Sequence, residues 1–117
     1  SGDASGATLL DTRLRATRDW LGRAPPETVS IQIMGSRSED QLDRQLRALA
    51  RQLESEQLFV FRTRAGERPS MTVLYGTFAT RDEARAALAS LPPPIRNFSP
   101  HLRTVQGVRA EIAASGS

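Results

Sequence analysis

The spacing of the apolar residues changes along this chain, and this change most constrains the fold. Val29, Ile31 and Ile33 recur at every second position, which is the period of a strand with one buried face. Four leucines then recur at spacings of four, three and four residues: Leu42, Leu46, Leu49 and Leu53. That spacing is typical of an amphipathic helix, and Ser36 and Glu39 ahead of it form a capping-box pattern. A strand followed by a helix is therefore predicted over residues 29–53.

The second half of the chain repeats the order of strand and helix. Residues 58–62 and 71–76 predict two strands of a hairpin, joined by a turn that contains Gly66 and Pro69. Thr80 and Glu83 then open a second helix with four inward positions: Ala84, Ala87, Leu88 and Leu91. A short fourth strand near residues 101–103 follows, and then a helical turn that carries three apolar residues: Val105, Val108 and Ile112.

The order of elements is thus β-α-β-β-α-β, which predicts an α+β fold of the split βαβ type. In this fold a four-stranded antiparallel sheet carries two helices on one face, and the other face is open to a ligand. An N-terminal helix over residues 8–23 and a linker to residue 26 precede the domain, which covers residues 27–112. Residues 1–7 and 113–117 are small and polar, so we expect them to be tails.

Alternation along the strands decides which side chains face the open side of the sheet. Gln32, Thr72 and Leu74 fall in the outward phase. On the strand over residues 58–62 we expect the rings at 59 and 61 to face the core and residues 58, 60 and 62 to face outward, with the opposite phase as the alternative. Trp20 of the N-terminal helix is expected to anchor that helix on the sheet or on a neighbouring helix.

The composition argues against catalysis. The 117 residues include no Cys and one His, His101, so a thiolate nucleophile, a metal site of several His or Cys ligands and a relay of two histidines are excluded within this chain. No apolar run approaches the roughly 18 residues of a membrane span. We therefore expect a single-domain binding protein, not an enzyme, with no metal and no cofactor.

The charge is unevenly distributed. Residues 1–58 carry eight Arg against nine acidic residues, a net charge of −1, whereas residues 59–117 carry eight Arg against four acidic residues, a net charge of +4. This asymmetry favours an anionic partner, although a solvated basic surface explains it equally well.

A nucleic-acid-binding module of the RNA-recognition type is one interpretation of a basic split βαβ domain. Such modules stack bases on aromatic residues of the central strands. Here Val73 and Gln32 stand where those rings are usual, and Gly76 replaces a valine of the pattern. Nucleic-acid binding therefore stays as the alternative function, and a protein-interaction domain without ligand chemistry is a third.

Four segments of the sequence form a recognisable series: IQIMGS at residues 31–36, VLYGTFATRDEARAAL at 73–88, LPPPIR at 91–96 and PHLR at 100–103. Together they resemble the SPOR domain, the bacterial peptidoglycan-binding module. Eight residues match the family pattern: Gln32, Val73, Gly76, Phe78, Glu83, Ala84, Ala87 and Leu88. The resemblance covers about residues 27–112, and the preceding helix with Trp20 resembles the lead-in of SPOR domains that end DamX-like or secretion-ATPase-like inner-membrane proteins.

The resemblance implies a monomeric, non-catalytic periplasmic module. Its expected partner is peptidoglycan, in particular glycan strands without stem peptides at the division septum, and not nucleic acid. Any contact with the membrane would be made through parts of a longer parent protein. The candidate glycan-binding residues are Gln32, Thr72, Leu74, His101, Arg103 and Arg62. His101 stands where division-associated members have Trp, so a sugar-stacking ring of that size is missing at this position.

Overall fold

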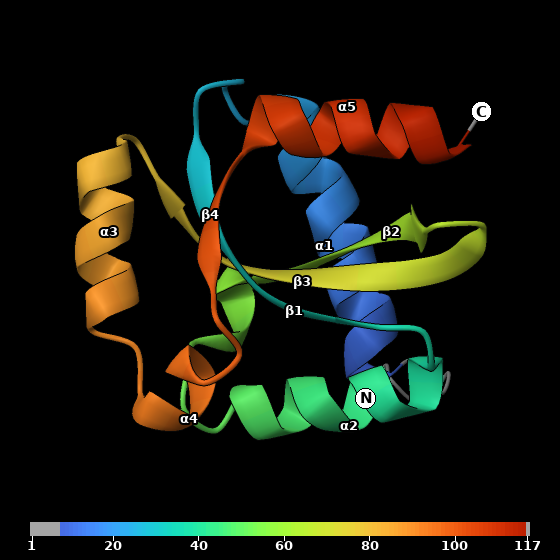
Figure 1. Ribbon diagram of the computed structural model, residues 1–117, viewed down its shortest axis with the longest axis horizontal. Coiled ribbons are helices and arrows are strands. Elements are labelled where there is room, and N and C mark those ends of the chain that lie inside the picture. The colour runs from blue at the N-terminus through green and yellow to red at the C-terminus, as the bar shows by residue number, and fades with distance from the viewer. Residues whose placement is uncertain (1–7, 117) are drawn as a thin grey trace.

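A four-stranded antiparallel sheet with the strand order β2-β3-β1-β4 forms the centre of the structure (Figure 1). The computed structural model describes residues 8–116, so the tail expected over residues 1–7 lies outside the described residues. The strands are β1 (Val29–Ser36), β2 (Leu58–Ala65), β3 (Arg68–Phe78) and β4 (His101–Thr104). The α+β fold of the split βαβ type predicted from the sequence is confirmed.

One face of the sheet, here called the first face, carries the larger core. Ile31, Val60 and Val73 are fully buried on it. They pack against the leucine stripe of α2 (Glu39–Leu49) and against residues at and after the end of α3 (Arg81–Ala89). The short helix α4 (Pro93–Arg96) follows α3 and begins with proline, a residue that is favoured at the first position of a helix.

The predicted N-cap is confirmed for α3 and wrong for α2. Thr80 caps α3 by accepting a hydrogen bond from the backbone N–H of Glu83, as predicted. The prediction for α2 was wrong by two residues, because its N-cap is Ser38, which accepts from the N–H of Gln41. Ser36 still belongs to β1, and its hydroxyl accepts from the N–H of Ser38 instead. Serines at both positions 36 and 38 made the sequence pattern ambiguous.

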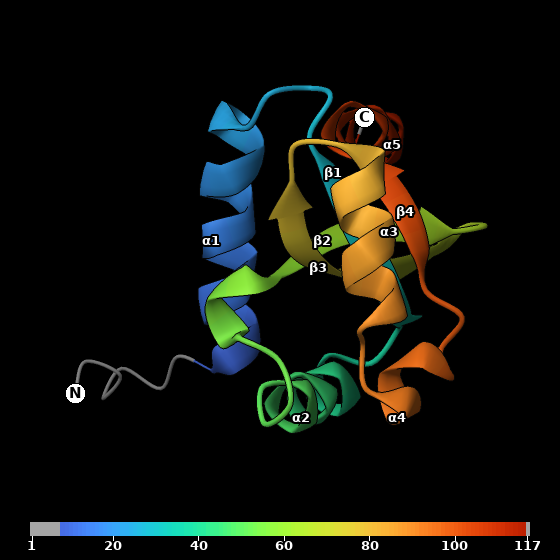
Figure 2. The same cartoon turned by 90° about the vertical axis from the view of Figure 1, so that its left-hand side faces the viewer.

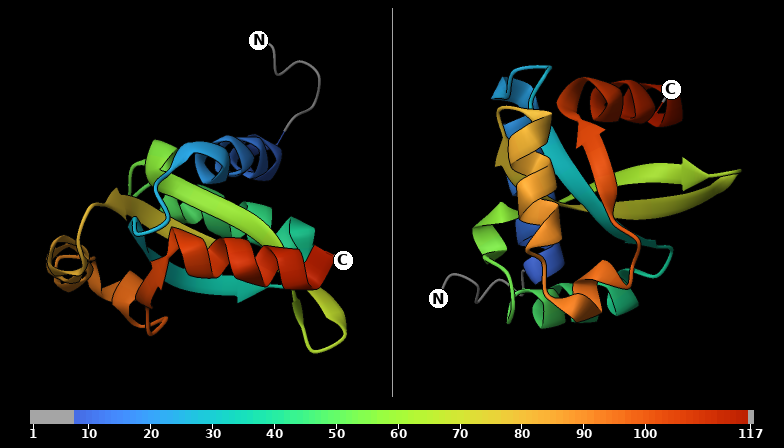
Figure 3. Two further views of the ribbon diagram at one scale, coloured as in Figure 1. Left: turned by 90° about the horizontal axis from the view of Figure 1, so that it is seen from above. Right: turned by 60° about the vertical axis from the view of Figure 1, so that its left-hand side comes forward.

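The other face, here called the second face, is not open along its whole length. The C-terminal helix α5 (Val105–Gly116) crosses it, opposite α2 (Figure 3, left). Val105 and Val108 of α5 pack with Phe59, Phe61 and Leu74 in a second apolar cluster. The predicted helical turn is therefore a helix that continues into residues 113–116, where two alanines favour helix.

The second cluster corrects the predicted phase of β2. Phe59 and Phe61 lie on the second face, whereas Leu58 and Val60 belong to the larger core on the first face. All four residues are buried. A strand that is covered on both faces is apolar in both phases, so its pattern does not distinguish one face from the other.

The N-terminal helix α1 (Leu9–Arg23) lies against β2, the strand at one edge of the sheet (Figure 2). The Arg13 Nε donates to the carbonyl of Leu58 at 2.7 Å, and the Thr17 hydroxyl accepts from the N–H of Val60 at 2.7 Å. Burial lowers the pKa of Arg13, while the nearby charge of Glu56 opposes this shift. Trp20 stacks on Phe59 with ring centroids 4.1 Å apart, which confirms its predicted role as an anchor.

None of the helices over residues 8–116 has the length and apolar content that a membrane crossing requires.

Candidate functional site

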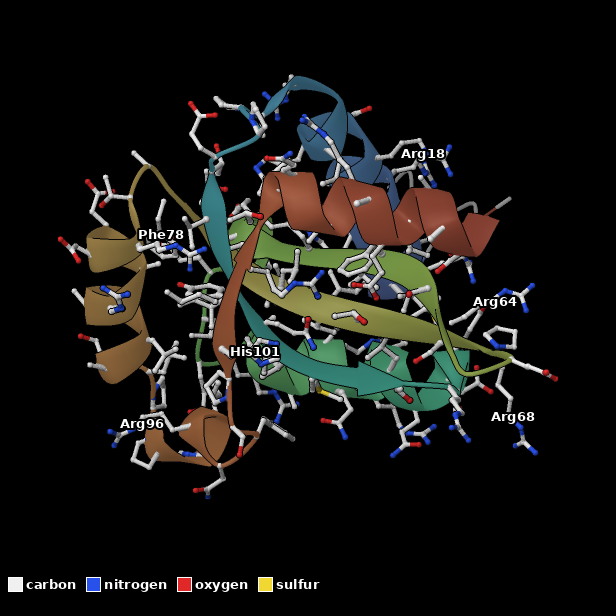
Figure 4. The ribbon with its side chains drawn as sticks, turned by 45° about the horizontal axis from the view of Figure 1, so that its top comes forward. Arg18, Arg64, Arg68, Phe78, Arg96 and His101 are labelled. Atoms are coloured by element: carbon white, nitrogen blue, oxygen red, sulfur yellow. The ribbon has the colours of Figure 1, made fainter. Side chains whose placement is uncertain are left out.

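The strand register brings three of the predicted site residues together on the second face. Gln32 of β1 lies opposite His101 of β4, and Arg103 lies opposite Ser30 two residues along the same pair of strands. His101 is exposed and Gln32 is partly exposed. Figure 4 shows His101 on β4, away from the end of the molecule where Arg64 and Arg68 lie. We call the side chains of Gln32 and His101 the polar patch.

Arg103 fixes the orientation of Gln32. Its Nη1 donates to the Gln32 Oε1 at 2.6 Å. Because a guanidinium only donates, the amide oxygen of Gln32 must face it, and the amide NH₂ is left for another partner. Among the described residues, the Gln32 NH₂ has no hydrogen-bond acceptor. The patch thus presents a fixed pair of donors to an acceptor such as the carbonyl of an N-acetyl group.

Arg103 is itself held by Glu111 of α5. The Arg103 Nη2 donates to the Glu111 Oε1 at 2.7 Å, and the Thr63 hydroxyl donates to the other carboxylate oxygen at 2.7 Å. Burial alone would raise the pKa of Glu111, but the hydrogen bonds from Thr63 and Arg103 and the charge of Arg103 outweigh it, so this pKa lies below its ordinary value. The Arg103 charge is therefore already paired within the protein.

The remaining predicted site residues are either buried on the second face or lie on the first face. Leu74 shares the second face with Gln32 but is fully buried under α5, so the expectation of an exposed Leu74 was wrong. Thr72 lies on the same face but is buried, with 7% of its surface exposed, so the expectation of an exposed Thr72 was also wrong. Arg62 points to the other side of the sheet, where its Nη1 lies 3.0 Å from a carboxylate oxygen of Glu39 in an exposed ion pair.

Sequence reasoning missed Glu111, which links Arg103 to Thr63 across the second face. The signal was present, since Glu111 follows Val108 by three residues and precedes Ile112. On a helix these three residues share a side. A longer helix at the C-terminus would have placed the carboxylate against the sheet.

A glycine in the family-like segment has a clear structural role. Gly76 has a φ of +88°, and it lies where the pairing of β1 with β3 shifts register. The Ser30 hydroxyl donates to its carbonyl at 2.7 Å. A side chain at this position would be strained by the backbone angle and would meet the ring of Phe78 at 2.5 Å. The glycine therefore shapes the centre of the sheet next to Ser30, the partner of Arg103.

Comparison with known proteins places these elements in a family. The model of the SPOR domain matches residues 25–104, which is more than half of the chain and includes all four strands with α2 and α3. No curated protein matches the chain. Helix α5 lies outside the matched residues, as does all of α1. The chain belongs to the SPOR domain family, a family of bacterial peptidoglycan-binding domains.

Proposed function

We propose that this chain binds peptidoglycan through glycan strands that lack stem peptides, as they occur at the division septum, and that the polar patch makes the contact. SPOR domains act on peptidoglycan in the periplasm, and we propose the same compartment here. The observation that carries the proposal is the fixed amide of Gln32, whose oxygen is bound to Arg103 and whose NH₂ faces no acceptor among residues 8–116.

The chemistry of the patch suits a bare glycan. Sugar hydroxyls and N-acetyl carbonyls accept hydrogen bonds from an amide, and the exposed imidazole of His101 offers a further polar contact and a small ring. Because Glu111 already pairs with Arg103, we do not assign Arg103 to a muramyl carboxylate. Its role in the proposed site is to position Gln32.

We also propose that binding occurs without cleavage. Within the described residues no group of three or more His, Cys, Asp or Glu side chains is arranged to hold a metal ion. The polar patch has one titratable side chain, His101, and no nucleophilic side chain in the described part of the chain is hydrogen-bonded to it. A purified sample should therefore release no soluble muropeptides from sacculi, and their release would overturn this part of the proposal.

Pelleting with purified sacculi tests the glycan preference. Sacculi treated with an amidase, which removes the stem peptides, should retain more of the protein than untreated sacculi at equal mass. Equal retention would contradict the preference for bare strands while leaving peptidoglycan binding intact. A single-stranded RNA in the same assay tests the alternative function, and retention by RNA at physiological salt would favour it.

A further inference from the structure

A concave surface lies along the edge of β2, away from the polar patch. It begins as a cavity of about 470 Å³ between α1, β2 and α5, whose apolar wall includes Leu14, Leu21, Phe61 and Ile112. A smaller cavity of about 210 Å³ continues along the strand past Arg62 and Arg64 to Pro69 and Ser115. Arg62 and Ile112 line both cavities, so the two form one strip, here called the β2-edge groove.

The backbone of β2 is only half covered at this edge. Two side chains of α1 bind outward backbone groups of β2. Arg13 donates to the carbonyl of Leu58, and Thr17 accepts from the N–H of Val60. The regular register with β3 continues to Ala65, and every second residue of a strand points its N–H and C=O to the same side. Arg62 and Arg64 therefore point theirs outward, and within residues 8–116 the outward backbone groups of Arg62 have no hydrogen-bond partner.

Positive charge surrounds this open edge. Arg18, Arg62 and Arg109 line the first cavity, and Arg64 lines the second. Arg109 donates to the carbonyls of Leu21 and Ala24, and among residues 8–116 it forms no ion pair with a carboxylate. Arg62 has an exposed ion pair with Glu39, which contributes little in water. Figure 4 shows Arg18 and Arg64 toward the same side of the molecule.

We propose that the β2-edge groove binds an extended acidic segment of a partner protein, which adds to the sheet next to β2 as a fifth strand. Hydrogen bonds to the backbone of Arg62 and Arg64 would hold the segment, as in other cases of strand addition. Its apolar side chains face the wall formed by Leu21, Phe61 and Ile112, and its carboxylates face the arginines. A second copy of this chain fits poorly, because pairing of two β2 edges brings arginines opposite each other.

A titration with synthetic peptides tests this proposal on the full chain. The probe is a capped octapeptide of alternating Glu and Val, and the matched control has Lys in place of Glu. In ¹⁵N NMR spectra the acidic peptide should shift the amide signals of Val60, Arg62 and Arg64 and slow the hydrogen exchange of the Arg62 amide. Equal binding of the basic peptide, shifts confined to the polar patch, or no binding of the acidic peptide would each overturn the proposal.

Two substitutions of Arg62 distinguish the contribution of its backbone N–H to peptide binding from the contribution of its side-chain charge. Arg62→Pro removes the outward N–H, which takes no part in the ladder with β3, and proline is tolerated at a strand edge. It should weaken acidic-peptide binding roughly tenfold or more, whereas Arg62→Ala keeps the N–H and should weaken it only about two- to fivefold. Equal effects of the two would contradict strand addition.

A third variant keeps the test valid if Arg62→Pro proves unfolded by circular dichroism. Arg18 lies on α1, outside the sheet. Arg18→Glu should weaken the binding of the acidic peptide but not the binding of the basic peptide. An unchanged affinity for the acidic peptide would overturn the assigned charge complementarity. All three variants leave the polar patch intact and should pellet with sacculi as the parent does, so failure of this proposal is distinguishable from failure of glycan binding.

Discussion

Arg103 and Glu111 form an ion pair at 2.7 Å that ties β4 to α5. The side chains are 20% and 34% exposed, so the pair is only partly shielded from water. Through Arg103 this contact reaches Gln32, and through the second carboxylate oxygen of Glu111 it reaches Thr63. Helix α5, which lies outside the family match, thus supports the residues of the proposed site.

This relationship predicts a pH-dependent stability. The pKa of Glu111 is lower in the folded chain than the ordinary value of a glutamate side chain. A lowered folded pKa means that the stabilisation is present above the unfolded pKa and is lost as the pH falls through the folded pKa. Glu111→Gln should therefore lower the free energy of unfolding by about 1 kcal/mol near neutral pH, after allowance for solvent screening.

The control for this prediction is the pH dependence of the stability difference between the parent and the variant. In urea unfolding between about pH 7 and pH 3 the difference between the parent and Glu111→Gln should shrink as the carboxylate of the parent is protonated. A difference that stays constant over this range would show that the charge of Glu111 does not contribute.

A second prediction concerns Gly76. Gly76→Ala should destabilise the fold by about 1–3 kcal/mol, because alanine is strained at a positive φ and its Cβ would meet the Phe78 ring. Gly22 offers a matched control, since it lies in α1 with no atom within 4 Å of an added Cβ. Gly22→Ala should stabilise the chain by about 0.5–1 kcal/mol, and the measurement is urea unfolding of both variants. A neutral Gly76→Ala would contradict the assigned strain.

A third prediction concerns α5. A chain that ends at Thr104 keeps every residue of the family match but uncovers Phe59, Phe61 and Leu74. Loss of their burial removes about 1.5–3 kcal/mol for each fully exposed side chain, which approaches the whole stability of a small domain. The shortened chain should bind a hydrophobic dye and lack a cooperative unfolding transition. Cooperative unfolding at the parent's urea midpoint would show that α5 is dispensable.

The sequence predicted correctly those elements whose apolar spacing identifies a single buried face. The stripe of α2 and the alternation of β1 placed Leu42, Leu46 and Ile31 in the core, where the structure has them. The phase of β2 was not predictable in this way, because LFVF is apolar on both sides and both sides are covered. The contact between α5 and the sheet depends on residues more than thirty positions apart, Val108 and Leu74 among them. A local sequence pattern does not predict contacts between residues so far apart in the chain.

The candidate site was predicted in part for a similar reason. Gln32 is outward by alternation alone, and His101 and Arg103 came from the likeness of PHLR to a family segment. Leu74 has the same phase as Gln32, so alternation gave it the same exposure. The two residues lie opposite each other on β1 and β3. Only the position of α5 distinguishes them, because α5 covers Leu74 and leaves Gln32 partly exposed.

Sacculus pelleting with Gln32→Glu tests most directly whether the Gln32 amide contacts the glycan. The substitution keeps an oxygen for Arg103 and so preserves the fold, but it replaces the two amide donors with an acceptor. The matched control, Gln52→Glu, makes the same change of charge at an exposed residue after α2. On amidase-treated sacculi Gln32→Glu should bind roughly tenfold more weakly or worse, and Gln52→Glu should bind like the parent. Equal retention of Gln32→Glu, Gln52→Glu and the parent would contradict the claim that the Gln32 amide contacts the glycan.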